Sequence, residues 1–99
     1  MKCYALTLAA EDDINGIWQY SYKQWGFDQA EKYYDQLEVC CEAIGKGQAR
    51  LKQIEGLPDG VCVYRCQEHY IFFLGGERPI IIAVLHGSMR FAKWLSKRV

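Results

Sequence analysis

Two apolar segments in the second half of the chain constrain its fold more than any other feature. They read HYIFFL at residues 69–74 and PIIIAVLH at residues 79–86, with a Gly-Gly turn between them. A strand with one exposed face alternates apolar and polar side chains, but both segments are apolar at odd and even positions. They therefore predict a hairpin of two central strands, in a sheet that is covered on both faces or that keeps its second face for a partner.

The first half of the chain predicts a strand followed by a pair of helices. Residues 2–8 alternate and are rich in strand-forming side chains. Residues 9–25 and 28–44 carry apolar side chains at helical spacing, and only a Gly-Phe link separates them. So short a link folds two helices into an antiparallel pair. At the start of the second helix, Asp28 and Glu31 have the spacing of a capping box.

The remaining segments complete an α+β pattern. Residues 45–60 are Gly-rich and loop-like, residues 61–67 alternate as a strand does, and the tail at 88–99 has the spacing of a short helix. We expect one domain over residues 1–99, because a chain of this length holds a single core. Its predicted fold is an N-terminal strand and an antiparallel helical hairpin packed on an antiparallel β-sheet.

Charge and hydropathy exclude several function classes. Twelve Lys and Arg residues balance twelve Asp and Glu residues, so the net charge is zero. A neutral chain has no general attraction to phosphate backbones. No apolar run reaches the length of a membrane span, and residues 1–13 lack the apolar core of a signal peptide. We therefore expect a cytoplasmic protein without a membrane partner and without direct sequence-specific binding to nucleic acid.

The cysteines predict neither a metal site nor a structural disulfide. Their number is odd, and neither the adjacent pair Cys40–Cys41 nor the spacing from Cys62 to Cys66 matches a zinc-binding pattern. In a reducing cytoplasm, cysteines most often act as small buried apolar residues. We expect no cofactor. The five cysteines are Cys3, Cys40, Cys41, Cys62 and Cys66.

Three motifs in fixed order resemble those of one toxin family. Residues 6–37 carry Leu-Thr at the end of the first strand, then Ala and Asp at the start of the helix, and Trp-Gly-x-x-Gln-Ala-x-x-Tyr across the link. A His-x-Ile-Phe pattern follows at residues 69–72, and Leu-His-x-x-Met at residues 85–89. The chain resembles the ParE-type toxins of the RelE/ParE superfamily. The matched residues of the first motif are Leu6, Thr7, Ala10, Asp13, Ile17, Tyr20, Trp25, Gly26, Gln29, Ala30, Tyr33 and Leu37.

This resemblance implies the toxin component of a type II toxin–antitoxin system. Such a toxin is neutralised by a ParD-like antitoxin, with which it forms a hetero-oligomer, and it acts by inhibiting DNA gyrase. Two alternatives stay open. RelE-like members of the superfamily cut messenger RNA on the ribosome, and an inactive toxin serves only as co-repressor with its antitoxin. The sequence departs from the family pattern at Arg90, where the family usually has Asp.

The residues that could cut RNA do not form a predicted catalytic set. Attack by a 2′-hydroxyl needs a general base, a general acid and cations that stabilise the phosphorane. A small nuclease is also expected to be basic. His69 and His86 stand at the outer ends of the predicted hairpin, where buried polar groups usually have structural hydrogen bonds. We therefore expect no catalytic residues and no enzyme. The candidates considered are Glu55, Arg65, His69, His86 and Arg90.

Aromatic side chains mark the expected antitoxin-binding surface. Seven of them crowd the helical hairpin, which is more than one side of a small core buries. Aromatic side chains often anchor interfaces, so we expect some of them to form an apolar patch for a partner. The alternative is that most of them lie in the core. The expected antitoxin-binding residues are Trp18, Tyr22, Trp25 and Arg65.

The C-terminal segment at residues 89–99 is the one locally basic stretch and, by resemblance, the place of contact with gyrase. The expected target-binding residues are Arg90, Lys93 and Trp94. One hypothesis is that this tail recognises the target and is dispensable for folding. The alternative is that its apolar side chains, Phe91, Trp94 and Leu95, cover the core, in which case removal of the tail would unfold the protein.

Overall fold

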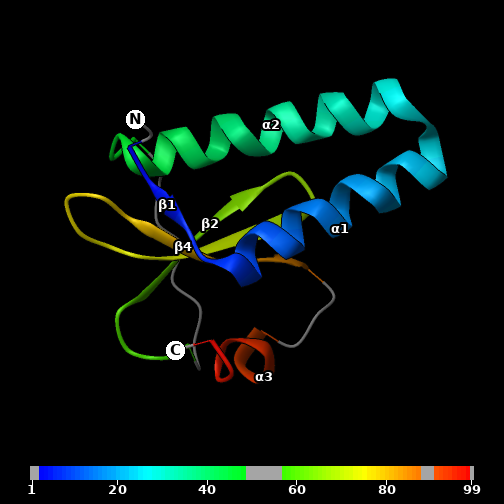
Figure 1. The fold of residues 1–99 in the computed structure, drawn as a ribbon. Coiled ribbons are helices and arrows are strands. Elements are labelled where there is room, and N and C mark those ends of the chain that lie inside the picture. Colours follow the sequence, from blue (N-terminus) through cyan, green and yellow to red (C-terminus); the bar gives the residue numbers. More distant parts are fainter. Residues whose placement is uncertain (1–2, 49–56, 88–90, 99) are drawn as a thin grey trace.

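The computed structural model describes residues 3–48, 57–87 and 91–98, and its elements follow the predicted order (Figure 1). A short strand precedes two long helices, and three strands and a short helix follow. The predicted α+β fold is confirmed. In chain order the elements are β1 (Ala5–Leu6), α1 (Leu8–Trp25), α2 (Phe27–Gly45), β2 (Val61–Cys66), β3 (His69–Leu74), β4 (Ile80–His86) and α3 (Phe91–Leu95).

The four strands form one mixed sheet in the order β1-β4-β3-β2. β2, β3 and β4 pair antiparallel, as predicted. One detail differs from the prediction, because β1 pairs in parallel with β4 and places Ala5 opposite Ile80 and Leu6 opposite Ile81. The neighbour of β1 in the sheet comes only after two helices and two further strands, so the first and last strands of the chain are adjacent.

The first strand is shorter than the predicted segment at residues 2–8, because the chain leaves the sheet at Thr7. The Thr7 N–H still donates a hydrogen bond to the Ile81 carbonyl of β4, at 3.0 Å. Its hydroxyl then caps α1 by accepting a hydrogen bond from the Ala10 N–H at 3.1 Å. One residue therefore ends the strand and begins the helix.

A glycine forms the link between α1 and α2. Gly26 has a φ angle of 92°, which L side chains rarely adopt. α2 begins directly after it at Phe27, so the predicted capping box does not form. Asp28 lies inside the first turn, where a carboxylate favours the positive end of the helix dipole, and Glu31 accepts a hydrogen bond from the Trp18 indole instead.

Of the helices that the structure describes, none has both the length and the apolar character that a membrane span needs.

β4 lies in the middle of the core, and both of its faces are covered. All residues of the segment Ile81–Leu85 are buried. The helical hairpin lies over one face of the sheet and contributes Leu37 and Ile44 of α2 to its core (Figure 1). α3 lies on the opposite face, where Leu95 packs in a second cluster with Phe72. The predicted two-sided burial is confirmed, and the second cover is a helix of the same chain.

The C-terminal helix is an integral part of the fold. Leu95 is completely buried, and the ring centroid of Phe91 lies 4.9 Å from that of Phe72 and 5.1 Å from that of Tyr70. The hypothesis that the tail is dispensable for folding is therefore contradicted for Phe91 and Leu95, since both cover the sheet. The alternative, that Trp94 also covers the core, does not hold for this residue, because 41% of its surface is exposed.

Asp13 ties α1, β4 and the C-terminal tail together. Its carboxylate accepts a hydrogen bond from the Val84 N–H at 2.9 Å. It also forms a bidentate ion pair with the Arg98 guanidinium, in which Nη1 contacts Oδ2 and Nη2 lies 3.1 Å from Oδ1. Arg98 also donates a hydrogen bond to the Ile82 carbonyl at 3.3 Å. The hydrogen bond to Asp13 raises the pKa of Arg98, so the guanidinium stays charged at neutral pH.

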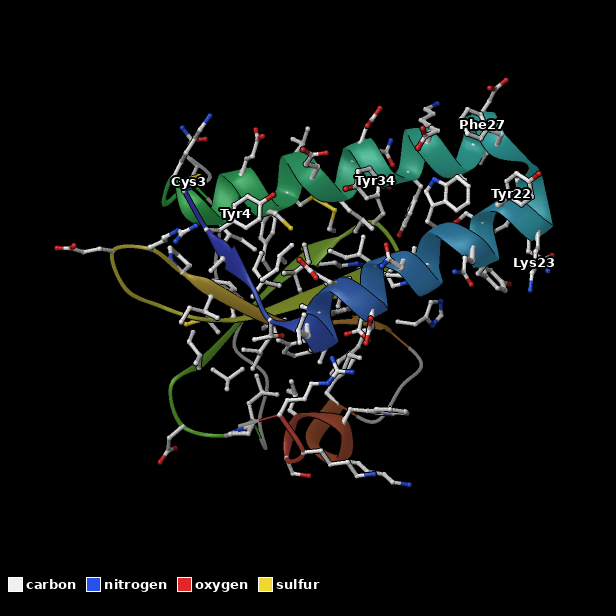
Figure 2. The ribbon with its side chains drawn as sticks, viewed as in Figure 1. Cys3, Tyr4, Tyr22, Lys23, Phe27 and Tyr34 are labelled. Carbon is white, nitrogen blue, oxygen red and sulfur yellow. A yellow bond between two sulfur atoms is a disulfide. The ribbon has the colours of Figure 1, made fainter. Side chains whose placement is uncertain are left out.

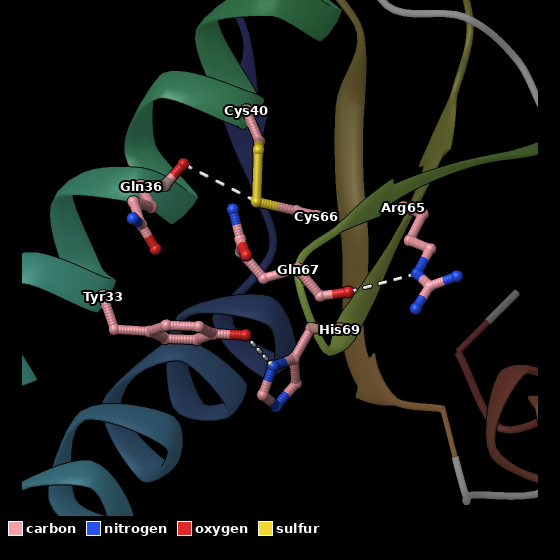
Figure 3. Close-up of a disulfide and its surroundings, with 7 residues drawn as sticks. All are labelled: Tyr33, Gln36, Cys40, Arg65, Cys66, Gln67 and His69. Atoms are coloured by element: carbon pink, nitrogen blue, oxygen red, sulfur yellow. Dashed lines mark hydrogen bonds between the residues drawn. A yellow bond between two sulfur atoms is a disulfide. The ribbon is translucent and has the colours of Figure 1, made fainter. Parts of the chain in front are cut away.

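A disulfide joins α2 to the end of β2, contrary to the prediction of no structural disulfide (Figure 3). The Cα atoms of Cys40 and Cys66 lie 6.2 Å apart, within the usual range for bonded cysteines. Cys3, Cys41 and Cys62 are outside this bond. Sequence spacing failed as a guide, because the bonded residues come from a helix and a strand that only the tertiary fold brings together.

We predict that Leu95→Ala lowers the free energy of unfolding by about 3 kcal/mol, because it removes a fully buried side chain from the face that α3 covers. Urea denaturation followed by circular dichroism measures the change. Lys93→Ala on the same helix is the control, since Lys93 is exposed, and it should change stability by less than about 0.5 kcal/mol. Equal stabilities for Leu95→Ala and the wild type would contradict the packing of α3.

Candidate functional site

An open groove of about 610 Å³ lies between α1, the start of α2 and the open end of the β3–β4 hairpin. It is called the groove below. α1 contributes half of its lining, and the rest comes from α2, the β2–β3 turn and the two central strands. Its lining residues are Asp12, Asp13, Gly16, Ile17, Tyr20, Ser21, Trp25, Gln29, Tyr33, Glu68, His69, Val84, Leu85 and His86.

The two histidines meet in the groove. His69 and His86 are paired across β3 and β4, and their ring centroids lie 5.4 Å apart. Tyr33 of α2 extends toward them, with its hydroxyl oxygen 2.6 Å from His69 Nδ1 (Figure 3). The predicted position of the histidines, at the outer ends of the hairpin, is confirmed. Tyr33 is a partner that the sequence did not identify, because its contact depends on how α2 lies over the sheet.

Burial keeps both members of this contact neutral. The pKa of His69 is lowered to about 4, first by burial and then by repulsion from His86. The pKa of Tyr33 is raised, also chiefly by burial. At neutral pH the Tyr33 hydroxyl therefore keeps its proton and shares a hydrogen bond with Nδ1 of an uncharged imidazole, in a direction that the tautomer of the ring sets. This arrangement supports a structural link between α2 and β3 rather than a cationic site.

The charged side chains of the groove are carboxylates. Asp12, Asp13 and Glu68 line it, and its described lining contains no Lys or Arg. Arg98 reaches Asp13 and is neutralised there. Such a surface repels a phosphate backbone and attracts positively charged groups. Within the described ranges, no group of three or more His, Cys, Asp or Glu side chains could hold a metal ion.

The remaining nuclease candidates do not join the histidines. Side chains alternate along a strand, so Arg65 points to the opposite face of the sheet from its neighbour Cys66, which faces α2. There its guanidinium lies 5.8 Å from the ring centroid of Tyr70, on the side of α3. The other two candidates, Glu55 and Arg90, lie outside the described residues.

Two exposed aromatic side chains line the groove. Trp25 is 64% exposed and Tyr20 is 59% exposed, and their rings meet edge to face at 5.9 Å. Trp25 was among the expected antitoxin-binding residues, whereas Tyr20 was missed. Tyr20 lies three residues after Ile17 and four after Gly16, both of which line the groove, and this helical spacing is the signal that could have identified it.

The other aromatic residues expected at this site lie elsewhere. Trp18 is half-buried, stacks on Tyr22 at 5.3 Å and donates from Nε1 to Glu31 at 3.0 Å, so it holds α1 against α2. It does not line the groove. Tyr22 is exposed near the tip of the helical hairpin, close to Phe27 (Figure 2). Arg65 is exposed on the other face of the sheet.

Two of the expected target-binding residues, Lys93 and Trp94, are not among the residues that line the groove. Lys93 and Trp94 are exposed on α3, on the face of the sheet opposite the helical hairpin (Figure 1). Arg90 lies outside the described residues. The fold therefore presents two separate surfaces, the groove beside α1 and the outer side of α3.

Comparisons with known proteins agree along nearly the whole chain. A family model described as the ParE toxin of a type II toxin–antitoxin system, parDE, matches residues 4–91. Toxin ParE of Escherichia coli is 33% identical over 101 aligned positions, which cover 100% of this chain and 98% of that protein. Toxin ParE1 of Caulobacter vibrioides is 36% identical over 89 positions, covering 90% and 93% of the two chains.

A solved structure shares the fold. The chain described as the chromosomal ParDE TA system from P. aeruginosa superposes with a TM-score of 0.70, covering 85% of this chain and 96% of that one. The two sequences are only 16% identical, so this likeness concerns the arrangement of helices and strands.

We predict that acidification destabilises the protein through His69. The folded pKa is about 4 and an unfolded histidine has a pKa of about 6.5, so the unfolded chain binds more protons between these values. The stabilising contribution is fully present above about pH 6.5 and is lost as the pH falls toward 4, by at most about 3 kcal/mol. Urea titrations along this pH range measure it. His69→Gln should flatten the slope relative to wild type, and His86→Gln should keep most of it; an unchanged slope in His69→Gln would contradict the assignment.

Proposed function

Since the chain belongs to the ParE toxin family of type II toxin–antitoxin systems, we propose that it is neutralised by a ParD-like antitoxin and that its target is DNA gyrase in the cytoplasm. The groove is the proposed antitoxin site, and the outer surface of α3 is the proposed gyrase contact.

The observation that carries the antitoxin proposal is the pairing of exposed aromatic rings with carboxylates in one groove. Trp25 and Tyr20 offer apolar area at one wall, and such side chains anchor protein interfaces. Asp12 and Glu68 offer negative charge. We infer that a segment of the antitoxin with apolar side chains and at least one Lys or Arg fills the groove. Tyr22, near the tip of the hairpin, is a proposed second contact, and Trp18 and Arg65 are not assigned to this site.

The gyrase proposal rests on the outer surface of α3. Lys93 and Trp94 expose a positive charge and an aromatic ring there, on a helix whose position Leu95 and Arg98 fix. A rigid helix that presents such a pair suits recognition of an acidic protein surface. We assign Arg90 to the same contact from its place in the sequence.

The groove also argues against a ribonuclease. Cleavage by 2′-hydroxyl attack needs cationic groups around the phosphate. The described lining of the groove carries Asp12, Asp13 and Glu68 beside a His69 that is neutral at pH 7. We therefore propose a toxin that acts by binding and has no catalytic residues.

We predict that filling the groove weakens antitoxin binding without harming the fold. A Cβ atom at Gly16 would meet no heavy atom within 4 Å outside the neighbouring backbone of its own helix, so Gly16→Leu should fold well and project into the groove. Calorimetric titration with the antitoxin should give an affinity at least tenfold lower. Asn15→Leu is the matched control, because Asn15 is exposed on the same helix and lies outside the groove, and its affinity should equal that of the wild type.

Removal of an aromatic anchor gives a second comparison in the same titration. Trp25→Ala should cost about 2 kcal/mol or more of binding free energy, whereas Tyr34→Ala, on an exposed position of α2 outside the groove, should cost less than about 0.5 kcal/mol. If Gly16→Leu and Trp25→Ala both bind as tightly as the wild type, the antitoxin does not occupy the groove.

We predict that expression without antitoxin causes DNA breakage and induces the DNA-damage response. Lys93→Glu combined with Trp94→Ala should abolish this effect while leaving antitoxin affinity and melting temperature unchanged, because both side chains are exposed and neither lines the groove. Asn15→Leu serves as the exposed control with full toxicity. Decay of messenger RNA without DNA damage would favour the ribonuclease instead, and no effect on growth would favour a co-repressor.

A further inference from the structure

The Cys40–Cys66 disulfide has no part in the binding proposed above, yet it lies beside the groove (Figure 3). Cys66 is the cross-strand partner of His69, which lines the groove. α2 has a second link to the same region of the sheet, the hydrogen bond between Tyr33 and His69. Cys40 follows Tyr33 by seven residues, two helical turns along the same face of α2. The two links together hold one helix against the strands.

The two sulfur atoms differ in their access to solution. Cys66 is only 2% exposed. Cys40 is half-buried and lines a second, open hollow of about 430 Å³. Lys32 and Asp35 of α2 and Gln67 of the β2–β3 turn also line this hollow. A small oxidant or thiol can therefore approach Cys40, whereas the rest of the fold shields Cys66.

The same geometry also accommodates the reduced pair. The Cys66 sulfur lies 3.6 Å from the carbonyl oxygen of Gln36, a distance at which a thiol donates a hydrogen bond. Gln36 precedes Cys40 by one helical turn, so the face of α2 that supplies the bonded sulfur also supplies an acceptor for the thiol. The buried cysteine therefore has a partner in either state.

We propose that Cys40 and Cys66 form a reversible redox site, oxidised by peroxides and reduced by dithiols, that regulates how tightly the groove binds the antitoxin. The regulatory part of this statement rests on the proposed function. In the cytoplasm thiols are normally kept reduced, and disulfides that form there usually act as redox sensors. The reduced toxin is then the resting form, and an oxidant produces the linked form.

Both chemical steps balance. The Cys40 thiolate attacks hydrogen peroxide, the O–O bond breaks, and Cys40 becomes a sulfenic acid as hydroxide leaves and is protonated to water. The Cys66 thiolate then attacks the Cys40 sulfur, the S–S bond forms, and a second water leaves. In the reverse direction a dithiol attacks Cys40, Cys66 leaves as a thiolate, and the second thiol of the reductant completes its own disulfide and frees Cys40.

The bond changes the groove through α2. Gln29 and Tyr33 line the groove from this helix, and the facing residues His69 and His86 come from the sheet. When α2 is bonded to β2, these two parts of the lining have less freedom to move apart before a partner binds. The toxin then loses less conformational freedom on binding, so its oxidised form holds the antitoxin more tightly.

The test compares oxidised and reduced forms of the full chain. Treatment with hydrogen peroxide or dithiothreitol is followed by intact mass, which should differ by two hydrogen atoms, and by peptide mapping, which should recover a Cys40–Cys66 linked pair. The melting temperature of the oxidised form should be higher by about 10 °C. Calorimetric titration with the antitoxin should give an affinity about tenfold higher for the oxidised form. Hydrogen exchange in α2 should be slower in that form.

Two variants make the comparison specific. Cys40→Ser, at the half-buried position, should give one mass and one affinity under both treatments. Cys62→Ser is the matched control, because Cys62 lies on the same strand as Cys66 and outside the disulfide, and it should keep the full redox response.

The outcomes separate the two proposals. Linkage through Cys3 or Cys62 in place of Cys40 and Cys66, or a redox response that persists in Cys40→Ser, would overturn the redox site. Equal antitoxin affinities of the two wild-type forms would overturn the regulation. An antitoxin that binds neither form would instead overturn the proposed function, and the mass and melting temperature would still report on the redox site.

Discussion

The burial of β4 on both faces is the constraint on which the rest of this structure depends. Five consecutive side chains, Ile81–Leu85, are removed from water, so neither face of the sheet can be left open. The helical hairpin covers one face and α3 covers the other. A five-residue helix has little stability of its own, and α3 is held by Leu95 in the core and by the ion pair from Arg98 to Asp13. The tail is therefore a structural cover whose outer side remains available for recognition.

The groove lies next to the part of β4 that the first strand does not reach. β1 has only two residues, so the far end of β4 pairs with β3 on one side and has no strand on the side of β1. Asp13 replaces the missing strand at one position by accepting the Val84 N–H. Beyond this point the exposed His86 and the half-buried His69 line the groove next to α1. An incomplete sheet edge, with a carboxylate in place of a backbone partner, thus produces a hollow that is both apolar and negatively charged.

Sequence periodicity was sufficient for the elements and insufficient for their contacts. The two-sided apolar runs of β3 and β4 predicted central strands, and the helical spacing around Gly26 predicted the hairpin, because both patterns are local. Trp18 and Trp25 are both tryptophans of α1, and the sequence gives no reason to separate them. In the structure Trp18 stacks on Tyr22, whereas Trp25 lines the groove. The Tyr33–His69 bond and the Cys40–Cys66 pair depend on where α2 lies over the sheet. No spacing along the chain carries that information.

The parallel pairing of β1 with β4 has a consequence for the order of events during synthesis. Ala5 pairs with Ile80, so the first strand has no neighbour until most of the chain has left the ribosome. The apolar faces of α1 and α2 also stay uncovered until this strand is made, since β4 carries much of the core beneath them. At translation speeds of about 5–20 residues per second, the chain spends several seconds without its central strand. The fold is therefore acquired only after β4 has been made, and a nascent chain without β4 has no assembled groove to offer any partner.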